Sequence, residues 1–139
     1  MGFTGPELCE VYRRMRTIRS FEEKLQELVS AGKIGGFMHL YAGQEAIAVG
    51  VCAQLKETDI VGSTHRGHGH ALAKGVPPRP LLAELYGRAT GCSQGRGGSM
   101  HLFKPEIGMM GTSGIVGPCI LQACGGGYSF KLLGRDNVA

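Results

Sequence analysis

Glycine is the feature of this sequence that most restricts how the chain can fold. It occupies 24 of the 139 positions and is densest between Gly87 and Gly127. No short repeat accounts for these glycines, which excludes a collagen-like or low-complexity chain. Glycine adopts positive φ angles and lets other groups approach the backbone closely. We therefore expect many tight turns and close backbone contacts in this region.

The composition predicts one folded domain. Hydrophobic residues make up 42% and charged residues 19%, a balance typical of globular rather than disordered chains. The length allows a single domain with a core of its own over residues 1–139. The longest apolar run, Ala46–Ala53, is too short to cross a bilayer, and the first residues do not resemble a signal peptide. We expect a cytoplasmic chain with no membrane partner.

The charge and cysteine patterns argue against a nucleic-acid-binding chain and against a disulfide-bonded chain. The net charge is +4, but the basic residues are scattered and only 6% of residues are aromatic, so a nucleic-acid partner is not expected. The five cysteines are odd in number and form no CxxC pair, which favours reduced thiols, buried at Cys52 and Cys124, over disulfides.

The N-terminal segment predicts a long amphipathic helix. Thr4, Pro6 and Glu7 form a helix start with a capping box, and Gly32 ends the helix. Apolar residues recur between these points at steps of three and four, as expected for a core-facing stripe. These residues are Leu8, Val11, Met15, Ile18, Phe21, Leu25 and Leu28.

The rest of the chain alternates helices with short strands, which indicates the α/β class. A second helix, about Gln44 to Leu55, is apolar on several sides and is expected to be buried or to face another subunit. Further elements are expected as follows: a strand at Ile60–Val61, helices at about His68–Lys74, Leu81–Tyr86 and Ile120–Leu132, and a strand that begins at Asn137–Ala139.

The densest group of polar residues lies between His65 and His70. Arg66 offers a planar fork of donors suited to a phosphate, and the neighbouring glycines let backbone N–H groups approach an anion. A zinc site made of His65, His68 and His70 is the rival, and an exposed polar loop is the third reading. The residue types favour an anion-binding site first, an exposed polar loop second and a zinc site third.

Three other segments leave alternatives open. The loop from Gly91 to His101 reads as an anion loop around Arg96 or as a flexible surface loop, and its composition narrowly favours the surface loop. The segment Gly111–Gly117 could present backbone groups to a flat heterocycle, although composition alone favours a buried turn. His39 follows a Gly-Gly pair and either lines a pocket or is an ordinary core histidine.

Taken in order, these segments resemble the α subunits of pyruvate dehydrogenase-type E1 enzymes. Each motif alone is weak, whereas six in order along almost the whole chain are specific. The pattern of Thr64–His70, followed by Ala73–Gly75, is most similar to the acetoin dehydrogenase branch. The six matching segments are Tyr12–Glu22, Gly36–Ala46, His65–Gly69, Glu84–Gly91, Gly95–His101 and Gly114–Gly117.

The resemblance implies a thiamine-diphosphate-binding fold, of which this chain is the N-terminal, helix-rich part of a parallel-sheet domain. It implies an α2β2 assembly with an E1 β subunit, with the cofactor held between the subunits. The residues that match the family's cofactor contacts are Phe37, His65 and Arg66, with the backbone of Gly114 and Val116; those that match its catalytic histidines are His39 and His101.

The resemblance also implies a function. The expected substrate is a small molecule, either acetoin or a 2-oxo acid such as pyruvate, and the acyl group passes to a lipoyl-bearing acyltransferase. The alternative is a truncated, non-catalytic paralogue or fragment that only assembles with a β subunit.

Two departures from the family pattern matter. The Mg2+ motif is expected beyond Ala139, so no metal ligand is expected within these residues. Gly126 and Gly127 would each cost a helix about 1 kcal/mol relative to alanine, so we expect the last helix to start late or to fray.

Overall fold

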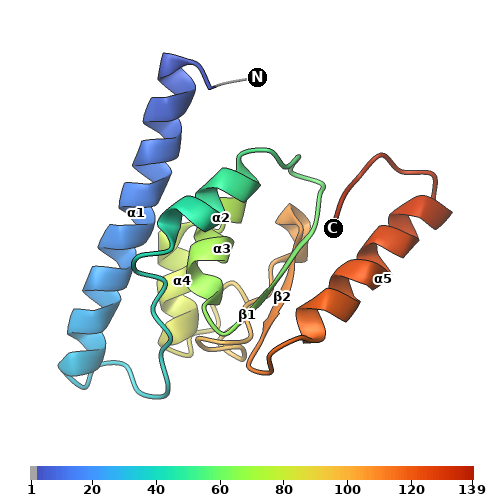
Figure 1. Cartoon of the computed structure of the whole chain (residues 1–139). Coiled ribbons are helices and arrows are strands. Elements are labelled where there is room, and N and C mark those ends of the chain that lie inside the picture. Colours follow the sequence, from blue (N-terminus) through green and yellow to red (C-terminus); the bar gives the residue numbers. More distant parts are fainter. Residues whose placement is uncertain (1–2) are drawn as a thin grey trace.

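The computed structural model describes residues 3–139. A two-stranded sheet divides the molecule into two layers of helices: α1 to α4 lie on one side, and α5 lies on the other (Figure 1). The chain continues after α5 and ends between β1 and α5. The elements are α1 Gly5–Ser30, α2 Glu45–Cys52, β1 Val61–Thr64, α3 Gly67–Lys74, α4 Pro78–Leu85, the 3-10 turn Pro105–Ile107, β2 Met109–Ser113 and α5 Pro118–Leu132.

The predicted start of α1 is confirmed. The Glu7 carboxylate accepts hydrogen bonds of 2.7 Å from both the backbone N–H and the hydroxyl of Thr4. Most of the predicted apolar stripe faces the core, and Ile18 and Leu25 are almost completely buried. Leu8 departs from the prediction and is exposed, because the first turns of α1 extend beyond the rest of the molecule (Figure 1).

The sheet is parallel, as the α/β class requires, but one of its two strands was not predicted from the sequence. β1 was expected at Ile60–Val61 and runs instead over Val61–Thr64. β2 was not expected, because Met109–Ser113 contains a glycine and no β-branched run. Pairing with β1 forms this strand in spite of its weak propensity, with Thr64 opposite Ser113.

The core lies on the α1–α4 side of the sheet. The buried side chains of α1, α2 and α3 pack together, those of α3 and α4 pack on β2, and the C-terminal half of α1 packs on α4. The central residues of these three clusters are Ile18, Tyr41 and Val49; Leu81, Leu102 and Met109; and Leu25, Ile34 and Leu85.

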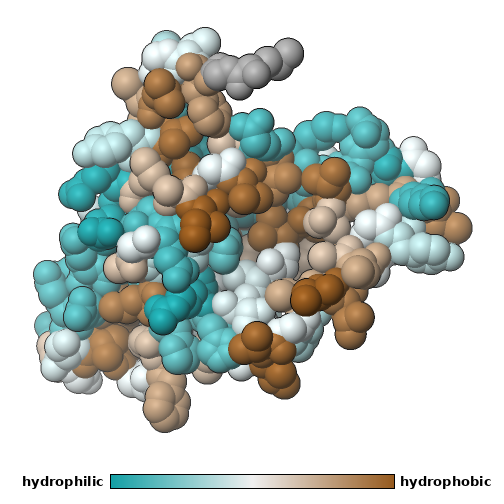
Figure 2. Space-filling model, viewed as in Figure 1, coloured by the Kyte–Doolittle hydropathy of each residue, from teal (hydrophilic) through white to brown (hydrophobic). Residues whose placement is uncertain are grey.

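The expectation for α2 is met in part. The helix is shorter than predicted and begins at Glu45, and Ala48 and Val49 are buried in the core. Ile47 and Val51 lie on the outer side and are 61% and 57% exposed. Figure 2 shows apolar side chains gathered over this helix. A surface of this kind is typical of an interface.

An ion pair joins α2 to α1. The Arg19 guanidinium donates to the Glu45 carboxylate at 2.6 Å, and the backbone N–H of Gly43 donates to the same carboxylate at 3.0 Å. The hydrogen bond from Arg19, helped by the backbone donors, lowers the pKa of Glu45 to about 2. The start of α2 is therefore held on α1 over the whole neutral range.

The last helix differs from the expectation. α5 begins at Pro118 and runs unbroken through the glycine triplet, so the prediction of a late start or fraying is wrong. A Cβ atom at Gly126 would overlap the Ile60 side chain, which shows that the glycine lets the helix pack closely on the start of β1. The outer apolar side chains of α5 stay exposed; these are Ile120, Leu121, Tyr128 and Leu132.

The five cysteines are free thiols, as expected. Cys52 is buried, and burial raises the pKa of its thiol. The expectation of burial is wrong for Cys124, which is exposed on α5 because that helix buries none of its residues.

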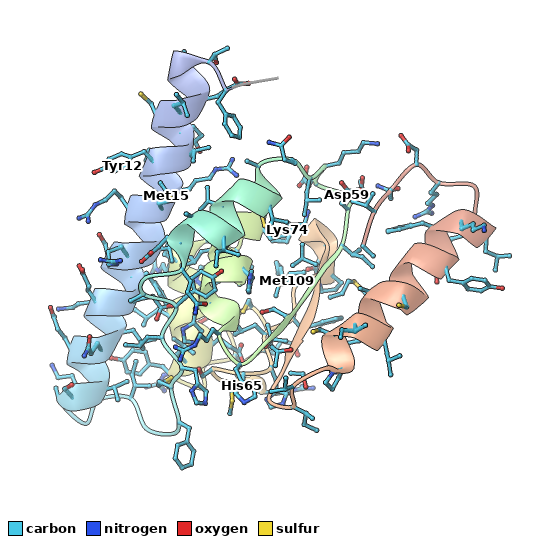
Figure 3. All side chains as sticks on the ribbon, viewed as in Figure 1. Tyr12, Met15, Asp59, His65, Lys74 and Met109 are labelled. Carbon is cyan, nitrogen blue, oxygen red and sulfur yellow. The ribbon has the colours of Figure 1, made fainter. Side chains whose placement is uncertain are left out.

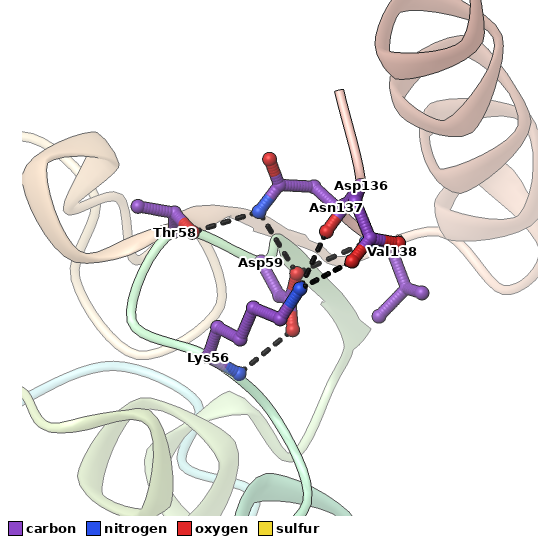
Figure 4. A network of polar contacts seen from close by, with 6 residues as sticks. All are labelled: Lys56, Thr58, Asp59, Asp136, Asn137 and Val138. Carbon is purple, nitrogen blue, oxygen red and sulfur yellow. Dashed lines mark hydrogen bonds and ion pairs between the residues drawn. The ribbon is translucent and has the colours of Figure 1, made fainter. Parts of the chain in front are cut away.

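A polar network ties the end of the chain to the turn before β1 (Figure 4). The buried Asp59 carboxylate accepts hydrogen bonds from the backbone N–H of Lys56 at 2.7 Å, the backbone N–H of Val138 at 3.0 Å and the Asn137 amide at 3.1 Å. The segment expected to begin a strand at Asn137–Ala139 is not a strand. It lies beside β1, because the N–H of Ile60 donates to the Val138 carbonyl at 3.0 Å.

Replacing Asp59 by asparagine is expected to lower the stability of the chain at neutral pH. The hydrogen bond from Val138, then those from Asn137 and Lys56, lower the pKa of Asp59. The stabilisation is therefore complete above the unfolded pKa, about 4, and is lost as the pH falls through the lower folded pKa. Urea unfolding from pH 7 to pH 2 measures this effect, with the exposed Asp136→Asn as control. A stability difference between wild type and Asp59→Asn that does not shrink at low pH would contradict the assignment.

Within residues 3–139, no helix combines the length and the apolar composition that a bilayer span requires.

Candidate functional site

The candidate site lies at the carboxyl ends of the two parallel strands. His65 and Arg66 follow β1 directly, and Gly114 follows β2. The strand register brings them together, and the His65 N–H donates to the Ser113 carbonyl at 2.9 Å. Figure 3 shows His65 at this end of β1 and Asp59 at the other end. In open α/β sheets, ligands bind outside the carboxyl ends of the strands.

His65 has an unusual backbone conformation. Its φ angle is +54°, a left-handed value that few residues other than glycine adopt. Such a conformation costs about 1–3 kcal/mol and is found most often at functional sites. The His65 ring meets the His39 ring edge to face, with centroids 5.2 Å apart. The fold thus unites two histidines that the sequence placed in separate motifs.

Arg66 connects the same site to the loop before α2. Its side chain is exposed, and its guanidinium donates to the Leu40 carbonyl. This contact holds the loop that carries His39, whereas Phe37 lies farther along the loop and is 84% exposed. A guanidinium has five N–H donors in a planar fork, so the Leu40 contact leaves donor capacity suited to an anion.

His101 lies at the other strand end. A Cβ atom built on Gly114 would lie 3.6 Å from Cε1 and 3.8 Å from Nε2 of the His101 ring, so the imidazole rests against Gly114. The Ser113 hydroxyl accepts a hydrogen bond from the N–H of Ile115 at 3.0 Å. Val116 follows with its side chain 80% exposed. This segment is an open turn, whereas composition alone favoured a buried one.

The remaining histidines of the 65–70 segment have separate partners. The buried His68 ring meets Glu22 Oε1 through Nδ1 at 2.9 Å and Ser99 Oγ through Nε2 at 2.8 Å. His70 meets Ser63 and Tyr41 at 2.6 Å and 3.2 Å, and burial lowers its pKa. The zinc reading therefore has no geometric support, and no group of metal-ligating side chains converges in the described part of the chain.

Glu22, His68 and Ser99 have the residue types of a Ser-His-acid triad, but their positions exclude that chemistry. Glu22 and His68 are completely buried, and Ser99 is 7% exposed. A substrate cannot reach a hydroxyl in this setting. The three side chains instead join α1, α3 and the loop before His101 through hydrogen bonds.

The backbone N–H groups of the glycine-rich loop bind a carboxylate of the protein itself, that of Glu84. The buried carboxylate of Glu84 accepts hydrogen bonds from the backbone N–H groups of Ser93 and Gly95 at 2.8 Å, Gly97 at 2.7 Å and Gly98 at 3.2 Å. The expectation of a flexible surface loop is wrong, because these four bonds fix the backbone. The alternative, a loop that binds an anionic ligand, is also wrong, because Glu84 already occupies these N–H donors.

Sequence reasoning missed Glu84, although the sequence contains a signal. Leu81, Glu84 and Leu85 lie on one face of α4 and are all buried. A glutamate on the apolar face of a helix must find hydrogen-bond donors inside the protein. The glycine-rich loop that follows α4 is the nearest supply of such donors along the chain.

Comparison with known proteins shows the family of this chain. The Dehydrogenase E1 component family matches residues 13–139, so the chain belongs to that family. The α subunit of acetoin:2,6-dichlorophenolindophenol oxidoreductase from Bacillus subtilis is 49% identical over 139 residues, which is 100% of this chain and 42% of that protein. The corresponding subunit from Cupriavidus necator is 48% identical over 131 residues, 94% of this chain and 39% of that protein.

A pyruvate dehydrogenase subunit is nearly as similar. The pyruvate dehydrogenase E1 component subunit alpha of Rhizobium meliloti is 46% identical over 137 residues, 99% of this chain and 39% of that protein. The chain thus spans about two fifths of the length of these relatives. These relatives include both acetoin oxidoreductase and pyruvate dehydrogenase subunits.

Proposed function

We propose that this chain is the N-terminal part of an E1 α subunit that binds thiamine diphosphate and acts on acetoin or a 2-oxo acid such as pyruvate. One observation carries the proposal. His65, Arg66 and Gly114 meet at the carboxyl ends of two parallel strands, where a cofactor would bind. The identity to acetoin oxidoreductase and pyruvate dehydrogenase α subunits supports the same conclusion.

The residues at this site fit the proposed cofactor. Arg66 supplies an exposed, planar set of donors to the diphosphate, and His65 lies beside it. The open turn at Gly114 and Val116 offers backbone groups to the aminopyrimidine ring. Phe37, His39 and His101 lie in segments that border the site, and we propose the two histidines as the catalytic residues. Bound thiamine diphosphate supplies a nucleophilic carbon and an electron sink, and the protein orients it and stabilises charge.

The proposed assembly is α2β2, with the cofactor between an α and a β subunit and with a lipoyl-bearing acyltransferase as acceptor. The exposed apolar side chains of α2 and α5 support a partner at these surfaces. Mg2+ is proposed as a second cofactor, held by residues beyond Ala139. The cytoplasmic location stays a prediction.

A dye-reduction assay tests the function. The complete α subunit, expressed with its β partner, is expected to reduce 2,6-dichlorophenolindophenol only when thiamine diphosphate, Mg2+ and substrate are all present. Acetoin and pyruvate are supplied in parallel, and their kcat/KM values decide which substrate is used. Dye reduction that needs no thiamine diphosphate would contradict the proposal. An assembled complex without turnover on either substrate would favour the non-catalytic alternative.

A further inference from the structure

The carboxylate of Glu84 is the centre of the loop that carries His101. Glu84 has no solvent exposure, and two N–H groups bond each of its oxygens: Ser93 and Gly95 bond Oε2, while Gly97 and Gly98 bond Oε1. A carboxylate offers about four lone-pair sites, so four donors match it. Hydrogen bonds from N–H groups to an ionised acceptor are about twice as strong as neutral ones. The backbone conformation from Ser93 to Gly98 is therefore set by this one side chain.

The four N–H groups of Ser93, Gly95, Gly97 and Gly98 that surround the Glu84 carboxylate are called the Glu84 cradle. Further hydrogen bonds connect this cradle to His101. Gly97, whose N–H is bonded to Glu84, accepts the N–H of His101 at 3.2 Å through its carbonyl. A Cβ atom at Gly97 would overlap the His101 carbonyl, so the two backbones touch. Ser93, also bonded to Glu84, accepts the N–H of Phe103 at 2.7 Å through its hydroxyl. The chain is thus attached to the cradle on both sides of His101.

A second anchor acts on the neighbours of His101 from β2. The Thr112 hydroxyl donates to the Met100 carbonyl and accepts the N–H of Leu102 at 2.8 Å. Thr112 holds Met100 and Leu102 on β2. Glu84 holds the preceding loop, Ser93 to Gly98. Together they leave the His101 imidazole against Gly114, at the carboxyl end of β2.

We infer that Glu84 is a positioning residue: through its cradle of N–H groups it holds the His101 imidazole against Gly114, at the edge of the proposed cofactor site. The catalytic consequence rests on the proposed function. Glu84 touches neither substrate nor cofactor and acts through the backbone. Misplacing a reacting group by about 1 Å can cost a hundredfold in rate, so loss of the carboxylate lowers kcat far more than it changes KM.

A merely structural role is separated from positioning by chemical rescue. Glu84→Ala removes the carboxylate and leaves a cavity that acetate fits, with its carboxylate facing the same four N–H groups. Glu84→Gln keeps the shape but replaces one acceptor oxygen by a donor NH2 group. The matched control is Leu85→Ala, a buried neighbour on the same helix whose apolar side chain packs in the cluster with Leu25 and Ile34.

The first readout does not depend on activity. The nuclear Overhauser contact between the His101 ring and the Gly114 α-protons is measured in this 139-residue chain. We expect Glu84→Ala and Glu84→Gln to lose the contact, acetate to restore it in Glu84→Ala, and acetamide to have no effect. Leu85→Ala keeps the contact. A wild-type contact in Glu84→Gln, or equal losses in Glu84→Ala and Leu85→Ala without rescue by acetate, would overturn the inference.

The second readout is turnover by the complete α subunit with its β partner. Glu84→Gln is expected to lower kcat by about ten- to a hundredfold with KM nearly unchanged, and acetate restores kcat in Glu84→Ala. Unchanged kcat in both variants overturns the catalytic part. If the wild-type complex shows no thiamine-diphosphate-dependent turnover, the proposed function fails, while the contact measured in the chain still decides the role of Glu84.

Discussion

Replacing Arg66 by alanine in the complete α subunit is expected to weaken thiamine diphosphate binding by about ten- to a hundredfold. A charge-assisted hydrogen bond to phosphate is worth about 1.5–3 kcal/mol, which corresponds to that range. The side chain of Arg66 is exposed at the end of β1 and has donors left after its contact with Leu40. The apparent cofactor constant, from activity titrated with thiamine diphosphate at fixed Mg2+, measures the effect. Turnover at saturating cofactor should change less than affinity.

Two further variants locate the effect at this position. Arg66→Lys keeps the charge but not the planar fork, and we expect an affinity between those of wild type and Arg66→Ala. Arg96→Ala removes another exposed arginine, from the loop around Glu84, whose side chain is not among the proposed cofactor contacts, and should leave the cofactor constant unchanged. An unchanged constant in Arg66→Ala would show that this residue is not a phosphate ligand.

The helices were predictable from sequence because their signals are local. The start of α1 is encoded in Thr4 and Glu7, and its buried face in the spacing of residues such as Ile18 and Leu25. The strand β2 was not predictable, because Met109–Ser113 has no local signal for a strand. Its hydrogen bonds come from β1, a distant segment, and only the folded chain brings the two together.

The candidate site was likewise predictable only as separate residues, because its assembly depends on contacts between distant segments. The sequence and its family resemblance named His39, His65, Arg66, His101 and Gly114 one by one. Without β2, nothing in the residues indicated that His65 and Gly114 end neighbouring strands. The contact between His101 and Gly114 lies at the end of β2, and the ring contact between His39 and His65 lies at the loop that Arg66 holds through Leu40. The cofactor roles of these residues stay predictions.

The glycine clustering has two physical causes in this structure. In the loop after α4, glycines allow the backbone to wrap around the Glu84 carboxylate and to touch the backbone of His101. In α5, Gly126 allows the helix to approach Ile60, the residue before β1. The glycine content of the sequence predicted close backbone approach in this region. It did not identify the partners, because an internal carboxylate and a ligand phosphate make the same demand on backbone N–H groups.

Removing the imidazole of His68 is expected to destabilise the chain by about 1–3 kcal/mol, the usual cost of leaving a buried hydrogen-bonding group without its partner. His68 and Glu22 are completely buried and meet at 2.9 Å, and Ser99 bonds the other ring nitrogen at 2.8 Å. In His68→Leu the Glu22 carboxylate loses its only partner in the described structure, since its Oε2 atom already has none. The free energy of unfolding of this chain in urea measures the loss.

The double variant Glu22→Met/His68→Leu tests whether the cost comes from the stranded carboxylate. Replacing both members of a buried pair by apolar residues of similar volume is often neutral or stabilising. We therefore expect the double variant to be more stable than His68→Leu alone, although Ser99 still lacks its partner. The matched control is His70→Leu, which removes contacts to Ser63 and Tyr41 but leaves no buried carboxyl group without a partner, so it should cost less than His68→Leu. Additive losses in the double variant would show that Glu22 and His68 stabilise the fold independently.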